Sequence, residues 1–186
     1  MAVAGGGADG RRAAARVALF PLPFQGNISP MLQLAGALHA RGLDVAVLHT
    51  VFSAPNPARH PPGFAFDAVP DAAPEAAAGG IAKILALNAA MEASGHVCDA
   101  LASLLAAEGE PRLACLVIDS TLTATQQAAA GLGLPTLVLR TGSAACFRLF
   151  KSYDMLYHKG YLPAQGSYNS AFVYLIEHEL RTTHSI

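Results

Sequence analysis

Tryptophan is absent from the chain, cysteine occurs three times, and only 13% of the residues carry a charge, about half the usual share in soluble proteins. The three cysteines, Cys98, Cys115 and Cys146, form no CxxC pair, which excludes a disulfide framework and gives no zinc pattern. Each lies in an apolar stretch, so we expect small buried side chains in a reducing, cytoplasmic setting.

A strong net charge and long apolar runs are missing as well. The formal charge is −1 and there is no basic stripe, which argues against a nucleic-acid binder. No segment approaches the ~18 uncharged apolar residues of a membrane-spanning helix. Alanine fills much of the chain, 38 of 186 residues, and the length is that of one domain of ordinary size.

The first 15 residues are rich in glycine, alanine and arginine and contain no apolar core of a secretory signal. We expect a disordered leader there. Regular patterning begins at Arg16, and no internal repeat follows.

Short apolar runs alternate with helical periodicity from Arg16 onward. The runs predict buried strands at 17–20, 45–48, 64–68, 113–118 and 136–139. Spacing and stop signals predict helices over 28–38, over 81–107 with a break near Ser94-Gly95, over 122–132, and from 143 towards 157. The proline-rich stretch 53–63 predicts a loop. This alternation is typical of an α/β, Rossmann-like parallel sheet with helices on both faces, whose ligands bind outside the carboxyl ends of the strands.

The turn after the first strand carries Gln25, Gly26 and Asn27. Gly26 would let the chain turn tightly, and Asn27 would cap a helix whose free N–H groups suit a phosphate or another oxyanion. The alternative is a plain strand–helix turn. Neither a GxGxxG motif nor a P-loop is present, so a dinucleotide site is not predicted.

Polar side chains also follow the fourth and fifth predicted strands. Asp119 ends an otherwise apolar run, and it either caps the next helix or orients a partner across the cleft. Thr141 and Ser143 flank a glycine and suit an oxygen-rich ligand or ordinary capping. The histidines are dispersed without acids at ligand spacing, so no metal site is predicted. No GxSxG elbow supports a hydrolase triad.

Several of these segments resemble plant small-molecule UDP-glycosyltransferases. The run VALFPLPFQG at 17–26, followed by SPMLQLA at 29–35, closely resembles the opening of that family. Further similar segments are LHT at 48–50, FSAPN at 52–56, FAF at 64–66, CLVID at 115–119, GLP at 133–135, TGS at 141–143 and KGYLP at 159–163. The resemblance covers 16–165, expected to be a Rossmann-like acceptor-binding domain. Residues 166–186 do not resemble the family and are expected to be a divergent tail.

The resemblance implies the N-terminal domain of a two-domain, GT-B type enzyme, in which one half binds a small lipophilic acceptor (phenolic or terpenoid) and the other a UDP-sugar co-substrate. It implies no metal and no further cofactor. In the family, a histidine after the first strand takes the acceptor's proton and an aspartate after the fourth orients it. The acceptor oxygen then attacks the sugar, which the resemblance implies is glucose, with inversion, and UDP leaves. Mapped onto this sequence, the orienting acid is Asp119, the donor side has Gly26, Thr141 and Ser143, and the acceptor side has Gln25 and Asn27.

Two departures from the family bear on activity. Asn27 stands at the position of the family's catalytic histidine. Because an amide cannot act as a general base, we expect this replacement to lower the rate of transfer by a factor of about 10²–10⁴. The family's tryptophan-containing donor box has no counterpart, so we expect the donor-binding half to be missing and the truncated chain to be inactive or very weak alone. The alternatives are a non-catalytic binding or interaction module and a pseudogene-like fragment.

Overall fold

The computed structural model describes residues 15–70, 80–108 and 111–161. The predicted leader, except for Ala15, and the predicted tail at 166–186 lie outside the described residues.

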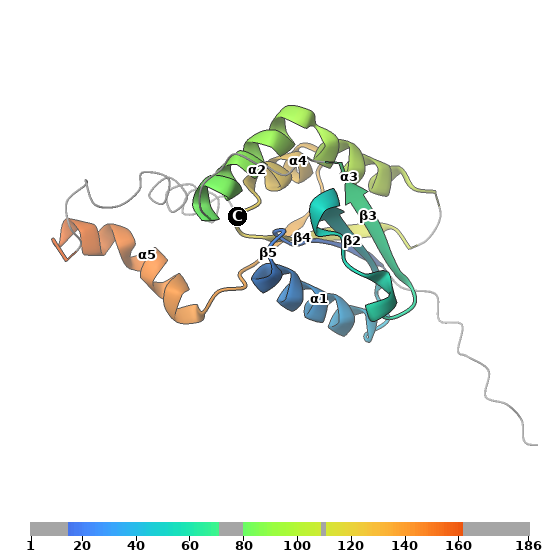
Figure 1. Cartoon of the computed structure of the whole chain (residues 1–186), viewed down its shortest axis with the longest axis horizontal. Coiled ribbons are helices and arrows are strands. Elements are labelled where there is room, and N and C mark those ends of the chain that lie inside the picture. The colour runs from blue at the N-terminus through green and yellow to red at the C-terminus, as the bar shows by residue number, and fades with distance from the viewer. Residues whose placement is uncertain (1–14, 71–79, 109–110, 162–186) are drawn as a thin grey trace, which may run out of the picture.

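A five-stranded parallel sheet forms the centre of the described chain (Figure 1). Its strands are β1 (Arg16–Phe20), β2 (Asp44–Thr50), β3 (Phe64–Val69), β4 (Leu113–Asp119) and β5 (Thr136–Leu139). Their order is β3-β2-β1-β4-β5, and every pairing is parallel. The predicted strands and the predicted α/β class are confirmed.

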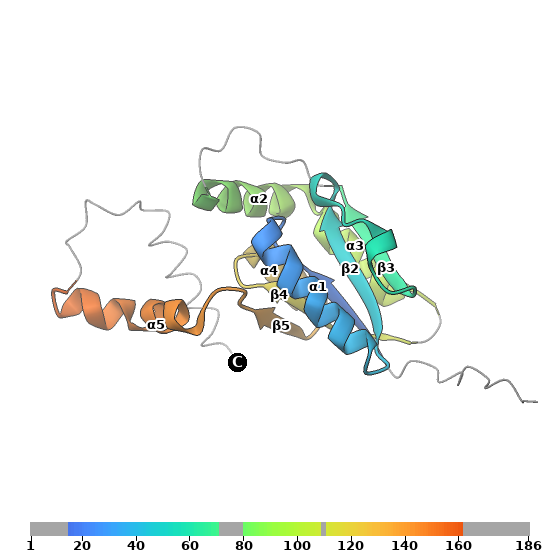
Figure 2. The same ribbon diagram turned by 60° about the horizontal axis from the view of Figure 1, so that its bottom comes forward.

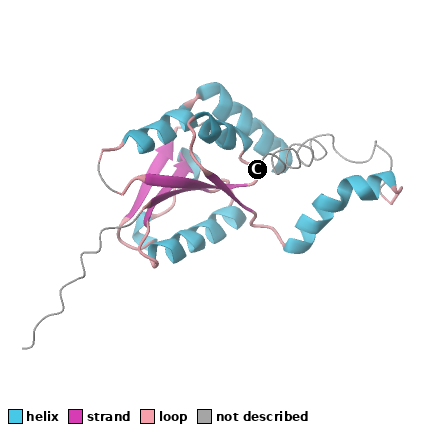
Figure 3. Ribbon diagram, turned by 180° about the vertical axis from the view of Figure 1, so that it is seen from behind, coloured by secondary structure: helices cyan, strands magenta, loops and turns pink. Residues whose placement is uncertain are grey.

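Helices cover both faces of the sheet, as Figures 2 and 3 show from two further directions. Helix α1 (Gln25–His39) lies on one face, and α2 (Gly80–Ser94), α3 (His96–Ala106) and α4 (Thr123–Gly131) lie on the other. Helix α5 (Ala144–His158) follows β5 and extends away from the sheet in both Figure 1 and Figure 2.

The two faces of the sheet bury two separate apolar layers. Val17 and Leu19 of β1 face α1, where they pack in one cluster with Met31. Phe20 faces the opposite way and packs with Leu101 in the layer beneath α2, α3 and α4. Because the central strands are covered on both sides, their sequences are nearly continuous apolar runs instead of alternating ones.

The break predicted within 81–107 lies at Gly95, between α2 and α3. Gly95 has φ +72°, a left-handed conformation that other residues adopt only with strain. The two helices can therefore meet at an angle while both pack on the same apolar layer.

The connection from β2 to β3 contains no α-helix. It consists of two short 3₁₀ turns, η1 (Val51–Ser53) and η2 (Pro57–Arg59), within the proline-rich stretch predicted as a loop. The Asn56 side chain holds η2 by accepting a hydrogen bond of 3.1 Å from the backbone N–H of Ala58. We call residues 51–63 the crossover segment.

The cysteines differ from the sequence expectation in one place. Cys98 is exposed, on the outer side of α3, so its predicted burial was wrong. Cys115 is partly buried in β4, and this burial raises the pKa of its thiol above the ordinary value. The side chain of Cys146 lies outside the description. Among the described residues, no helix is both long and apolar enough to cross a membrane.

Candidate active site

The strand order reverses between β1 and β4, and this topology brings distant parts of the chain together. The chain leaves β1 towards α1 on one face and leaves β4 towards α4 on the other. Such a switch point opens a crevice at the carboxyl edge of a parallel sheet. Asn27, in the first turn of α1, and Asp119, the last residue of β4, therefore meet although 92 residues separate them.

Asn27 donates both of its amide hydrogens to this edge. Its Nδ2 lies 2.9 Å from Asp119 Oδ2 and 2.8 Å from Thr141 Oγ1, just beyond β5. We call these three residues the Asn27 cluster. They come from three different strand ends, so the sheet, and no local motif, fixes their geometry.

Asp119 is buried, at 2% exposure, and is held by hydrogen-bond donors. Its Oδ1 accepts from the backbone N–H of Thr121 at 3.1 Å and from the Thr121 hydroxyl at 2.9 Å. Its Oδ2 accepts from Asn27, and from the Thr141 hydroxyl at 3.5 Å. A carboxylate accepts about four hydrogen bonds in total. Asp119 does not cap α4, whose cap position is Leu122 without a side-chain cap, so that alternative was wrong. Its Oδ1 instead fixes the turn before α4, and its Oδ2 bonds to Asn27 across the edge.

The carbonyl oxygen of Asn27 has no partner among the described residues. The carboxylate of Asp119 only accepts hydrogen bonds, so the Asn27 nitrogen must face it and the oxygen must point elsewhere. Asn27 is half-buried, which leaves this oxygen accessible at the carboxyl edge. The cluster therefore offers a fixed hydrogen-bond acceptor to a hydroxyl group.

The predicted roles of Gly26 and Asn27 in the turn were wrong. Helix α1 begins at Gln25, and Phe24 occupies the cap position with no side-chain cap. Gly26 lies within the helix, has no left-handed φ, and a Cβ there would meet nothing within 4 Å. The turn therefore does not require glycine. Asn27 does not cap α1, because its side chain is committed to Asp119 and Thr141.

Two other predicted residues lie outside the Asn27 cluster. The side chain of Gln25 donates to Ser29 Oγ at 3.1 Å and lies on a different face of α1. Ser143 is exposed beyond β5, and its carbonyl accepts from the N–H of Phe147 at 3.1 Å in the first turn of α5.

Sequence reasoning missed Asn88, which supports the cluster from α2. Its Oδ1 accepts from the N–H of Ala124 at 2.9 Å and from the Thr123 hydroxyl at 3.2 Å, and so caps α4, which has no cap residue of its own. Its Nδ2 donates to the carbonyl of Thr121 at 2.8 Å. Asn88 thus fixes the position of Thr121, and Thr121 in turn donates hydrogen bonds to Asp119. The available signal was a lone amide within the apolar helical run ILALNAAM at 84–91.

No group of three histidine, cysteine, aspartate or glutamate side chains is placed to hold a metal ion within the part of the chain that the structure describes.

Comparison with known proteins identifies the lineage. No family model matches the chain. It is 46% identical over 160 residues to the DIMBOA UDP-glucosyltransferase BX8 of Zea mays, a match that covers 81% of this chain and 34% of that protein. It is 36% identical over 163 residues to UDP-glycosyltransferase 76F2 of Arabidopsis thaliana, covering 82% and 34%. The chain thus spans about a third of the length of the curated relatives it matches.

Solved structures agree on the fold. Apo UGT2 of Phytolacca americana aligns with a TM-score of 0.70 at 20% identity, over 90% of this chain and 43% of that one. Os79 of O. sativa aligns with a TM-score of 0.67 at 20% identity, over 89% and 43%. The sheet and its helices are therefore those of a GT-B type glycosyltransferase domain. By sequence, the matched part of the chain belongs to the plant UDP-glycosyltransferases.

Proposed function

We propose that this chain supplies the acceptor side of a UDP-sugar-dependent glycosyltransferase, with the carbonyl oxygen of Asn27 receiving the hydroxyl of a small lipophilic acceptor. The observation that carries the proposal is the Asn27 cluster. Asp119 and Thr141 take both amide hydrogens and leave only the oxygen to face outward. A fixed acceptor at the carboxyl edge of the sheet suits a phenolic or terpenoid hydroxyl.

The same cluster limits catalysis. In sugar transfer, the acceptor oxygen bonds to the anomeric carbon, the bond from that carbon to UDP breaks, and the hydroxyl proton must pass to a base. An amide oxygen accepts a hydrogen bond but has no useful proton affinity near neutral pH. Asp119 is buried, and donors already occupy both of its oxygens. Asn27 therefore binds the acceptor but cannot act as its general base. The absence of a base at this position lowers the rate of transfer by a factor of about 10²–10⁴.

The donor side of the proposal concerns Thr141, with Ser143 just after it in the chain and Gly26 next to Asn27. A UDP-sugar, glucose in our proposal, would lie against this end of the edge. Transition-state stabilisation in such a cleft needs preorganised groups on both sides of the reacting atoms. The described residues provide one side, so turnover by this chain alone would be absent or very slow. We place the protein in the cytoplasm and in plant secondary metabolism.

Binding tests the acceptor role directly. Solved Phytolacca americana UGT2 is complexed with pterostilbene, a phenol with one hydroxyl, so pterostilbene and its O-methyl ether form a matched pair of probes. By calorimetry we expect the phenol to bind about tenfold more tightly than the ether, since only the phenol donates to Asn27. Asn27→Ala should remove this preference, and Gln127→Ala, an exposed amide on α4, should retain it. Equal affinities for the two probes in the unmodified chain would contradict the proposal.

The rate of glucoside formation tests whether position 27 is the position of the general base. A chimera carrying the donor-binding half of a relative is given UDP-glucose and pterostilbene, with asparagine or histidine at position 27. We expect the Asn27→His chimera to form glucoside at least a hundredfold faster. Equal rates in two chimeras that both bind pterostilbene would show that position 27 is not the base position.

A second candidate function is a non-catalytic binding module. The replacement of a basic group by Asn27 favours it, because the cluster keeps every hydrogen bond that orients an acceptor. Pterostilbene binding without turnover in the asparagine chimera would support this second function over enzymatic activity.

A further inference from the structure

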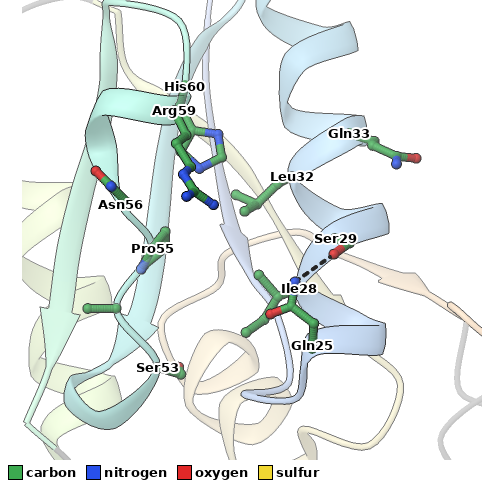
Figure 4. Close-up of a pocket in the computed structure, with 11 residues that line it drawn as sticks. Gln25, Ile28, Ser29, Leu32, Gln33, Ser53, Pro55, Asn56, Arg59 and His60 are labelled. Atoms are coloured by element: carbon green, nitrogen blue, oxygen red, sulfur yellow. Dashed lines mark hydrogen bonds between the residues drawn. The ribbon is translucent and has the colours of Figure 1, made fainter.

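A groove runs between α1 and the crossover segment, on a different face of α1 from Asn27. Its volume is about 460 Å³, within the range of small-molecule sites. Figure 4 shows the side chains of Arg59 and His60 reaching from the crossover segment towards Leu32 of α1, with Ile28 one turn below. The groove therefore has a cationic end and an apolar wall.

The guanidinium of Arg59 has no partner among residues 15–70, 80–108 and 111–161. It forms neither an ion pair nor a side-chain hydrogen bond there, and none of the described residues that line the groove is acidic. Gln25, Gln33 and Asn56 add only neutral amides to the lining. The described lining of the groove thus contains no counter-ion for Arg59.

The crossover segment is held in place before any ligand binds. The hydroxyls of Thr50 and Ser53 lie 2.6 Å apart, and Asn56 holds the turn that carries Arg59. The His60 ring is stacked on Phe64, with ring centroids 6.1 Å apart and planes 8° apart. A site that is ordered in advance loses less conformational entropy on binding.

We propose that this groove binds a small organic carboxylate with a flat apolar body. Arginine matches a carboxylate with two parallel N–H donors, and Ile28, Leu32 and Pro55 supply the surface for the body of the ligand. An inorganic anion would use Arg59 alone and leave the apolar wall in water. The proposal does not rest on the glycosyltransferase function, because Asn27 takes no part in the groove.

Binding of 1-naphthoate to the full chain tests the proposal, with the neutral 1-naphthalenemethanol and inorganic phosphate as comparison probes. By calorimetry and ligand-observed NMR, we expect naphthoate to bind at least tenfold more tightly than either. Arg59→Gln should weaken naphthoate binding about tenfold, and Arg41→Gln, an exposed arginine outside the groove, should leave it within twofold. Leu32→Ala should weaken it severalfold, with circular dichroism confirming that each variant is folded.

Three results would overturn the proposal. These are equal affinity for the carboxylate and the alcohol, phosphate binding as tight as naphthoate binding, and an Arg59→Gln variant that binds like the unmodified chain. A competition arm separates this site from the acceptor site. Saturating pterostilbene should leave naphthoate affinity unchanged, and displacement would show that the two molecules share one site. Naphthoate binding stays measurable even if pterostilbene does not bind, so the two proposals fail separately.

Discussion

Asn27 and Asp119 form a pair in which one side chain only accepts hydrogen bonds and the other donates both of its amide hydrogens. Asp119 is buried, and none of its described hydrogen-bond partners is a cation. Neutral donors from Asn27, Thr121 and Thr141 therefore stabilise the carboxylate. The identity of the atoms at this contact therefore matters more than the size of the side chains.

Asp119→Asn replaces one carboxylate oxygen by an amide nitrogen, although the groups that face both oxygens are all hydrogen-bond donors. We expect a loss of about 1–3 kcal/mol in the free energy of unfolding, because donors then face donors in a buried site. Urea denaturation measures the change. Glu92→Gln, an exposed acid changed to its amide on α2, should stay within about 0.5 kcal/mol. A stable Asp119→Asn protein would mean that the edge rearranges to re-pair these groups.

Gly63 is the residue where the backbone most clearly requires glycine. Its φ is +107°, and an added Cβ would lie 3.3 Å from Cε1 of His39. Gly63→Ala should cost about 1–3 kcal/mol in urea denaturation, since it adds backbone strain to a close contact. The matched change Gly36→Ala, in α1 with open space around it, should stabilise by about 0.5–1 kcal/mol. Similar effects at the two glycines would contradict this assignment.

The positions of Asp119 and Thr141 could be predicted from the sequence, because each lies at or just beyond the end of an apolar run and parallel strands end at one edge. The pairing of Asn27 with Asp119 was implied only by the family resemblance, which puts Asn27 in the place of the histidine that the acid orients, and the bond to Thr141 was not predicted. Local preference places an asparagine before a helix as its cap, and only the completed sheet offers the Asp119 carboxylate and the Thr141 hydroxyl as stronger alternatives. Arg59 and His60 were missed for a similar reason, since their groove exists only once the crossover segment lies beside α1.

At the scale of elements, α4 depends on a cap that another helix supplies. Asn88 of α2 bonds to the first turn of α4 and to the turn that precedes it. The packing of α2 therefore contributes to the placement of Asp119, at the other end of that turn.

Asn88→Ala should cost about 1–3 kcal/mol in thermal or urea unfolding, because it removes a helix cap and leaves buried backbone groups unpaired. Gln127→Ala, an exposed amide on α4, should change the free energy of unfolding by less than about 0.5 kcal/mol. In addition, Asn88→Ala should weaken pterostilbene binding, through the loosened Asp119 turn. A destabilised variant with unchanged pterostilbene affinity would confine Asn88 to a structural role.

At the scale of the whole molecule, the sheet is buried at its centre and open beyond β5. Leu137 and Val138 of β5 are 60% and 45% exposed, and α5 extends away from the layers that cover the sheet (Figure 2). The order of the elements was predictable from the alternation of strands and helices. The placement of α5 was not, because an amphipathic pattern does not identify the surface against which a helix packs.

Native-state hydrogen exchange should reveal this difference in packing. We expect the amides of α5 to exchange through local opening at a much lower free energy than those of β1 and β4, which approach the global value. Helix α3, also on the outside but packed through Val97 and Leu101, serves as the internal control. Protection of α5 equal to that of α3 in a monomeric sample would contradict the expectation.

The meeting of Asn27 with Asp119 and Thr141 also has an evolutionary consequence. A side chain at position 27 that donates once, such as a neutral imidazole, satisfies Asp119 and releases the Thr141 hydroxyl, whereas asparagine occupies both. The fitness effect of a change at any one of these positions must then depend on the residues at the other two. Mutational paths between a histidine and an asparagine at position 27 should therefore show epistasis with position 141, separated by 114 residues of sequence and by one hydrogen bond in space.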